Sequence, residues 1–222
     1  FEYILKQVSG RNMAWDCATV NGQSARDLAP YFQKVMATDI SSNQLSNAVR
    51  IPNVFYSVQA AEKTEFADSS FDLVTVSQAL HWFDFDLFYK ELIRVTKHGG
   101  WFAAWMYGGM TISPAIDAIK QHFHDSTLGP YWDPERKFVN SNYATIPFPL
   151  KEIPCPVFSL SFEWRPEDVA GYLHTWSALQ KFIKDKGFNP VDEIMERIMP
   201  LWQNEKMRVQ FPLHLRMGQV LK

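Results

Sequence analysis

The sequence predicts a doubly wound α/β fold around a mostly parallel sheet. Short apolar runs alternate with stretches of helical spacing as far as residue 107, an alternation typical of β-α-β crossovers. Two of these runs end in an acid, at Asp16 and Asp39, as the first two strands of a nucleoside-binding unit do. A later run, Phe71–Val76, is almost continuously apolar, which indicates a strand buried on both faces.

The elements of the first half follow in order. The chain opens within an amphipathic helix pattern that Ser9 and Gly10 end, so we expect residues upstream of Phe1 in the complete protein. A helix that starts near Gly22 is indicated by apolar residues at helical spacing, and the pair Gly99–Gly100 ends the last helix of this half. We expect strands at 13–17, 34–39, 54–58, 71–76 and 101–107, and helices at 22–32, 42–49 and 84–97.

The alternation of strands and helices stops after residue 107. We expect helices at 113–125, 166–186 and 190–203, strands at 157–164 and 209–220, and an irregular stretch at 129–154. Pro166 stands at the favoured first helical position. The sequence therefore predicts one domain over residues 1–222, with a ligand-binding core at 1–108, cap insertions at 109–150 and 165–205, and a last strand at 209–220.

The composition narrows the classes of function. The 222 residues carry a net charge of −2 with both signs interspersed, which indicates neither a nucleic-acid face nor a polybasic membrane anchor. No apolar run is long enough to span a membrane. The two cysteines, Cys17 and Cys155, form no disulfide or zinc-ligand pattern, so we expect a cytoplasmic protein. The aromatic content of 15% suits a ligand pocket walled by rings.

Several motifs in this order resemble those of one family. The acid and glycine of the first loop stand at Asp16 and Gly22, and Asp39 ends the second strand. The further matches are Ala61–Glu62 before Phe66–Asp72, Ser77–Asp84 after the fourth strand, Glu91–Gly100 with His98 at the usual proline, and Gly129–Trp132, Thr175–Ala178 and Phe211–Arg216 in the second half. The chain resembles the class I S-adenosylmethionine-dependent methyltransferases, and within them the small-molecule branch that contains trans-aconitate methyltransferase-like proteins.

The resemblance implies a fold, a cofactor and a set of site residues. It implies a seven-stranded Rossmann-like sheet with helical cap insertions, and an enzyme that converts S-adenosylmethionine to S-adenosylhomocysteine while it methylates a small molecule, for which a carboxylic acid is one candidate. The cofactor-binding residues expected are Asp16, Ala18, Gly22, Asp39, Ile40, Ala61, Glu62, Ser77 and Gln78, and the acceptor-binding residues expected are His81, Trp82, Tyr107, Trp132 and Arg165.

Three acids in this set each leave two roles open. Asp39 binds the ribose hydroxyls or is an acid favoured by a helix dipole. Asp16 holds the methionyl end, through its ammonium or a water, or caps the loop. Glu62 contacts the adenine with its side chain, or the backbone of Ala61 and Glu62 makes the contact while the side chain is solvated.

The acceptor-site residues also have alternative roles. His81 is a general base, a wall of the pocket or a structural histidine. Arg165 binds an acceptor carboxylate, which its planar fork would match, or is a surface charge at a helix start. His122 and His124 are two apart on a helix and so point to different faces, and we expect no metal site.

The first loop departs from the family at two positions. Ala18 and Val20 stand where the family has glycine, which serves there because the backbone takes unusual dihedral angles close to the ligand. A β-branched residue at positive φ is an outlier. We hypothesise that cofactor binding is weakened or that the loop is rearranged, and a non-catalytic protein on this fold is the alternative function. A nicotinamide dehydrogenase is disfavoured because the loop lacks G-x-G-x-x-G and Asp16 would stand near the pyrophosphate.

Overall fold

The structure is a computed structural model that describes all residues from Phe1 to Lys222. The helices are α1 Glu2–Gln7, α2 Gln23–Leu28, α3 Ser42–Ser46, α4 Phe85–Val95, α5 Pro114–His122, α6 Arg136–Asn140, α7 Pro166–His174, α8 Ser177–Lys186 and α9 Val191–Ile198. The strands are β1 Met13–Cys17, β2 Lys34–Asp39, β3 Val54–Val58, β4 Phe71–Ser77, β5 Thr96–Tyr107, β6 Lys151–Ile153, β7 Phe158–Trp164 and β8 Met207–Gln219.

The strands form one mixed sheet in the order β3-β2-β1-β4-β5-β8-β6, and β7 pairs with β8 beside this path. The pairs from β3 to β5 are parallel, whereas β6 and β7 run antiparallel to β8. The chain moves outward from β1 to β3 and then returns to β4 on the other side of β1, so the order reverses between β1 and β4. Open α/β sheets bind ligands at the carboxyl ends of the strands at such a reversal. The predicted doubly wound, mostly parallel fold is confirmed.

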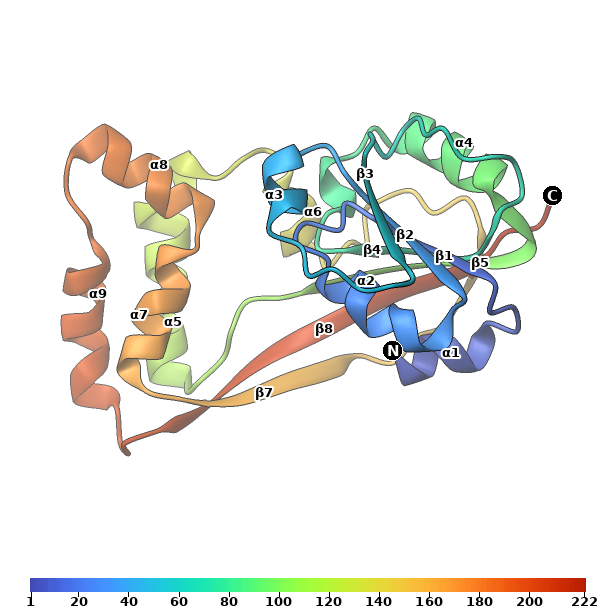
Figure 1. Cartoon of the computed structure of the whole chain (residues 1–222). Coiled ribbons are helices and arrows are strands. Elements are labelled where there is room, and N and C mark those ends of the chain that lie inside the picture. Colours follow the sequence, from blue (N-terminus) through green and yellow to red (C-terminus); the bar gives the residue numbers. More distant parts are fainter. The chain divides into compact units, whose positions relative to one another are not determined.

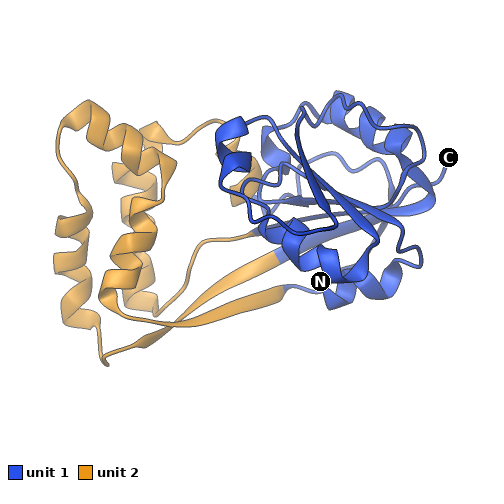
Figure 2. Cartoon of the chain, in the orientation of Figure 1, with its two compact units in different colours: residues 1–106, 141–157, 214–222 blue, residues 107–140, 158–213 orange.

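Contacts divide the chain into two compact units, each with its own core (Figure 2). The first unit comprises residues 1–106, 141–157 and 214–222 and contains the parallel sheet. Figure 1 shows α1 and α2 on one face of this sheet and α4 on the other. Every residue of β4 except the last is buried, and the fully buried side chains of this unit include Trp15, Leu28, Leu73, Phe88 and Phe102. The apolar strands thus form a core covered by helices on both faces.

The second unit comprises residues 107–140 and 158–213. It contains α5 to α9, β7 and the first half of β8. Its core joins fully buried residues of α5, α7, α8 and α9, among them Ile116, Leu173, Leu179 and Ile198. The helices bury these apolar stripes against one another, because none is long enough to be stable in water alone.

Several elements differ from the predicted ones. Two helices are shorter, since α3 ends at Ser46 rather than residue 49 and α2 ends at Leu28 before a 3-10 turn. The helix 84–97 ends at Val95, because Thr96 already pairs with Phe71 and so begins β5. The sheet has eight strands where seven were expected, since Lys151–Ile153 pairs with β8 inside the stretch expected to be irregular. The expected helix 166–186 is two helices, α7 and α8, and Trp176 between them has extended backbone. The helix expected at 113–125 is α5 followed by a π-helical turn at Phe123–Thr127.

Candidate functional site

A cavity of about 290 Å³ in the first unit lies at the carboxyl ends of four consecutive parallel strands. Its lining residues come from the segments after β1, β2, β3 and β4, and they are Ala18, Val20, Asp39, Ile40, Gln59, Ala61, Glu62, Gln78, Ala79, Trp82 and Phe83. Small-molecule sites usually enclose about 300–1,000 Å³. The cavity therefore has the place and the approximate size of a ligand site.

The loop after β1 keeps glycine-like backbone angles without the glycines. Ala18 has φ 54° and Val20 has φ 55°, both in the left-handed region that L-residues seldom adopt. Gly22, with φ 82°, precedes α2, and a Cβ there would collide with the Tyr56 ring. The loop is therefore not rearranged into ordinary dihedral angles. The side chain of Val20 is 43% exposed and lines the cavity.

Asp39 joins this loop to the end of β2. One carboxylate oxygen accepts a hydrogen bond from the Val20 backbone N–H and the other from that of Ser41, both at 2.9 Å. Thr19 N–H also donates to the Thr38 carbonyl at 2.9 Å. Each carboxylate oxygen has two acceptor sites, so Asp39 can accept further hydrogen bonds from a ligand in the cavity that it lines.

Asp16 lies beneath the loop rather than on the cavity wall. It is 1% exposed, and its two carboxylate oxygens accept hydrogen bonds from the hydroxyls of Thr19 and Thr75. Burial raises the pKa of Asp16 to about 6, although these hydroxyl donors oppose the shift. Its visible role is to fix the loop. Gly22 and Ser77 of the expected set likewise do not line the cavity.

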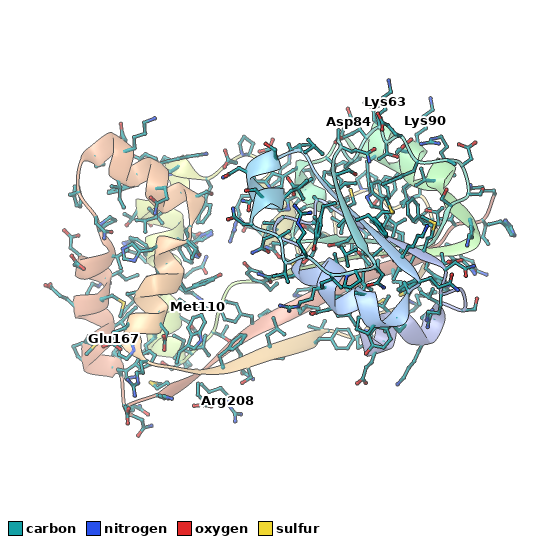
Figure 3. The ribbon with its side chains drawn as sticks, viewed as in Figure 1. Lys63, Asp84, Lys90, Met110, Glu167 and Arg208 are labelled. Atoms are coloured by element: carbon teal, nitrogen blue, oxygen red, sulfur yellow. The ribbon has the colours of Figure 1, made fainter.

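The segment after β3 is held in place by α4. The Arg94 guanidinium donates to the backbone carbonyls of Phe66 at 2.7 Å and Thr64 at 3.3 Å, and it forms a two-point ion pair with Glu91. Glu91 also accepts from the backbone N–H of Thr64 at 2.7 Å. At the cavity, the Glu62 carboxylate accepts from the backbone N–H of Asp84 at 3.1 Å. Asp84 and Lys63 lie at the surface of this unit (Figure 3).

The residues after β4 have contrasting environments. Gln78 has φ 54° and lines the cavity, as does the 56% exposed Trp82. His81 between them is buried, and its Nδ1 lies 2.8 Å from the Tyr143 hydroxyl. Non-glycine residues with a left-handed backbone are strained and cluster at functional sites. Ala18, Val20 and Gln78 are three such residues, and all three border this cavity.

The other expected acceptor residues belong to the second unit. Tyr107 ends β5, and its ring meets Phe211 edge-on. The Trp132 indole N–H donates to the His124 carbonyl at 3.1 Å. Arg165 directly precedes α7 as its N-cap residue, and its guanidinium lies 2.6 Å from the Glu205 carboxylate.

Four lining residues are absent from the expected set: Val20, Gln59, Ala79 and Phe83. Gln59 directly follows β3, and Ala79 and Phe83 flank expected positions, so the rule that ligands lie beyond the carboxyl ends of strands could have found them. Val20 stood out only as a departure from glycine.

No group of three or more His, Cys, Asp and Glu side chains is placed to hold a metal ion. No helix has the length and apolarity needed to cross a membrane.

Comparison with known proteins decides the family. A methyltransferase-domain family model matches residues 15–104, a segment that runs from within β1 into β5 and contains all the cavity residues. A putative methyltransferase from Dictyostelium discoideum is 32% identical over 213 residues, which are 92% of this chain and 81% of that protein. The chain belongs to the class I S-adenosylmethionine-dependent methyltransferases.

Solved structures agree with this assignment. The structure of a putative type II methyltransferase from Anaeromyxobacter dehalogenans matches with a TM-score of 0.91 and 35% identity, over 99% of this chain and 94% of that one. A putative methyltransferase from Bacillus halodurans shares the fold at a TM-score of 0.57 and 18% identity, over 100% and 98% of the two chains. The cofactor of this methyltransferase is S-adenosylmethionine.

Proposed function

We propose that this methyltransferase binds S-adenosylmethionine in the cavity beyond β1 to β4 and transfers its methyl group to a small molecule. One observation carries the proposal. The loop after β1, which contains the left-handed residues Ala18 and Val20, is hydrogen-bonded through the Val20 N–H to Asp39 at the end of β2. Asp39 supplies acceptors for ribose hydroxyls, Ile40 and Trp82 supply apolar walls for an adenine, and the loop supplies backbone close to the methionine moiety.

The charges of the cavity suit this cofactor. Asp39 and Glu62 both line it, and no lysine or arginine does. S-adenosylmethionine carries a sulfonium and an ammonium, which this negative wall attracts, whereas a pyrophosphate would be repelled. The cofactor supplies an activated methyl group, and the residues of the chain bind and orient the reactants.

The finer placement, in the branch resembling trans-aconitate methyltransferases, is also a proposal. Its support is the motif order from Asp16 to Arg216 and the aromatic content of 15%, which suits a ligand pocket walled by rings. A carboxylate acceptor is already ionised at neutral pH and needs no general base, which agrees with the burial of His81 against Tyr143.

The test is isothermal titration of S-adenosylmethionine and S-adenosylhomocysteine into the parent protein, Asp39→Asn and the double variant Ala18→Gly/Val20→Gly. We expect the parent to bind both ligands and Asp39→Asn to bind about 10- to 100-fold more weakly, the usual effect of losing a charged hydrogen-bond acceptor. Low-micromolar binding by the parent would refute the hypothesis that Ala18 and Val20 weaken the site.

Binding only by the double variant would contradict the proposed function and favour the non-catalytic alternative. In that outcome the side chains of Ala18 and Val20, which both line the cavity, would be the cause. Cofactor-dependent methylation of any small acceptor by the parent protein would exclude the alternative.

A further inference from the structure

The second unit contains a guanidinium that has no carboxylate partner. Arg136, in α6, is half-buried and forms no ion pair, and its Nε donates to the Asn140 side chain at 3.3 Å. Burial lowers the pKa of Arg136, and the electrostatic effect of Tyr172 and Tyr107 partly opposes this by raising it. An arginine remains charged in proteins and has five N–H donors, so most of the donors of this side chain are available to a ligand.

The Trp132 ring covers this guanidinium, and further aromatic rings pack against Trp132 and its neighbours. Its central carbon lies 4.4 Å from the centroid of the Trp132 ring, a cation-π contact. The Trp132 ring lies 4.7 Å from that of His124 and 5.6 Å from that of Trp176, and Trp176 is 6.0 Å from Tyr172. We call Arg136, Trp132, His124, Trp176, Tyr172 and Tyr107 the Arg136 cluster. All six belong to the second unit.

The other charges near the cluster do not neutralise Arg136. Burial lowers the pKa of His124, so its ring is neutral at neutral pH, and its Nδ1 lies 2.7 Å from the exposed Asp125 carboxylate. Asp133 pairs with Lys181 at 2.5 Å. Burial raises the pKa of Tyr172 to about 12, so its hydroxyl keeps its proton and can donate it in a hydrogen bond.

We propose that the Arg136 cluster binds a carboxylate of the methyl acceptor, with Arg136 as the charged anchor and the rings as the walls for the apolar part of the molecule. A half-buried cation without a counter-ion is costly, and a carboxylate matches the guanidinium fork with two parallel hydrogen bonds. The ring of Trp132 covers one face of the guanidinium, which leaves its edge for this pairing.

The charges of the two sites link the cluster to an acidic acceptor. The cofactor cavity offers an anion no lysine or arginine, whereas the Arg136 cluster offers a guanidinium without a carboxylate partner. The inference rests on the proposed function in that it takes the bound carboxylate to belong to the acceptor. It assigns the role expected of Arg165 to Arg136, because Arg165 is 54% exposed and already paired with Glu205.

The experiment measures binding of carboxylates and of their uncharged amides to the complete protein saturated with S-adenosylhomocysteine. The probes are benzoate, phenylacetate, succinate and citrate, with benzamide and phenylacetamide as uncharged counterparts. We expect at least one carboxylate to bind and the amides not to bind. In Arg136→Gln the carboxylate affinity should fall by about 10- to 100-fold, as for loss of a hydrogen bond to a charged group. Arg136→Lys, which keeps the charge and loses the fork, should be intermediate.

Arg208→Gln is the matched control. Arg208 is an exposed arginine of the same unit, 3.6 Å from Glu163, and its side chain extends away from the ribbon (Figure 3). Its loss should leave carboxylate affinity unchanged. Equal affinity in the parent and Arg136→Gln, equal binding of amides and acids, or no carboxylate binding by the parent would overturn the proposal.

A separate titration of S-adenosylhomocysteine distinguishes this proposal from the proposed function. All residues of the cofactor cavity belong to the first unit, so Arg136→Gln should bind the cofactor product as the parent does. Far-UV circular dichroism and a thermal unfolding profile equal to the parent's show that the second unit of the variant is folded. A parent that does not bind S-adenosylhomocysteine contradicts the proposed function. A parent that binds it and no carboxylate contradicts only the Arg136 proposal.

Discussion

Val20 occupies a backbone conformation that suits glycine. A left-handed conformation costs an L-residue roughly 1–2 kcal/mol, and Val20 has φ 55°. Its backbone N–H bond to Asp39 does not depend on the side chain. A valine-to-glycine change, which normally weakens a fold through the added freedom of the unfolded chain, should here relieve strain.

We predict that Val20→Gly raises the free energy of unfolding by up to about 1 kcal/mol, the left-handed penalty less the entropy cost of glycine. Urea denaturation measures this change. The control is Val58→Gly at the end of β3, another exposed valine, which has no left-handed strain to relieve and should lose stability. Equal losses in the two variants would show that the Val20 backbone is not strained.

Asp16 should make the fold less stable as the pH rises. Its pKa is about 6 in the folded protein, against an ordinary value of 3.8. Between about pH 4 and pH 6 the folded protein keeps a proton that the unfolded chain releases, so the free energy of unfolding falls through this interval. The penalty is absent below the unfolded pKa and complete above the folded one, where it is on the order of 3 kcal/mol.

Asp16→Asn cannot ionise and should therefore lose this pH dependence. Its amide can still bond to the hydroxyls of Thr19 and Thr75. We predict that the variant gains stability relative to the parent as the pH rises from about 4 to about 7, measured as the difference between two urea denaturation series. The other carboxyl groups titrate in both proteins and cancel. A difference that stays constant with pH would contradict the raised pKa.

At the scale of elements, α4 fixes the segment that carries Ala61 and Glu62 to the cavity. Arg94 is partly buried and donates hydrogen bonds from α4 to two backbone carbonyls of this segment. Glu91 accepts a hydrogen bond from the backbone N–H of Thr64 in the same segment. Removal of the guanidinium leaves the buried Glu91 carboxylate without its cation, and removing one partner of such a pair is more harmful than replacing both.

We predict that Arg94→Ala lowers the free energy of unfolding by about 2–3 kcal/mol, less than for a fully buried pair because solvent screens Arg94. S-adenosylhomocysteine binding should weaken as well, since Glu62 lies on the same segment. Lys90→Ala is the matched control, because Lys90 is an exposed cation of the same helix and should have little effect (Figure 3). Equal stability of the two variants in urea denaturation would show that the network does not hold the segment.

The strands of the first half could be predicted closely and the helices of the second half less so. The expected strands 13–17, 34–39 and 54–58 coincide with β1, β2 and β3, because apolar runs between turn residues have sharp ends. The break between α7 and α8 has no glycine or proline to announce it. It arises from the buried Trp176, whose extended backbone ends one helix before the next begins, and packing of this kind is not written in local sequence.

At the scale of the whole molecule, the fold class could be predicted from the sequence. Which arginine pairs with a carboxylate, and which has none, could not. Arg165 was expected to bind an acidic acceptor because its planar fork matches a carboxylate, yet it pairs with Glu205, which is forty positions away in the sequence. Arg136 carried no sequence signal, because only the structure shows that no carboxylate faces it and that Trp132 covers it. Pairing over such separations depends on how the helices pack.

The two units have separate cores, and this should be visible in unfolding. Leu73 of β4 and Leu173 of α7 are each fully buried in one of them. Leucine-to-alanine changes at such sites cost about 2–5 kcal/mol, and a ligand stabilises the part of a protein that binds it. We predict two calorimetric transitions, of which S-adenosylhomocysteine raises one. Leu73→Ala should lower that transition and Leu173→Ala the other. A single transition, lowered by both substitutions and raised by the ligand, would mean that the units unfold as one cooperative body.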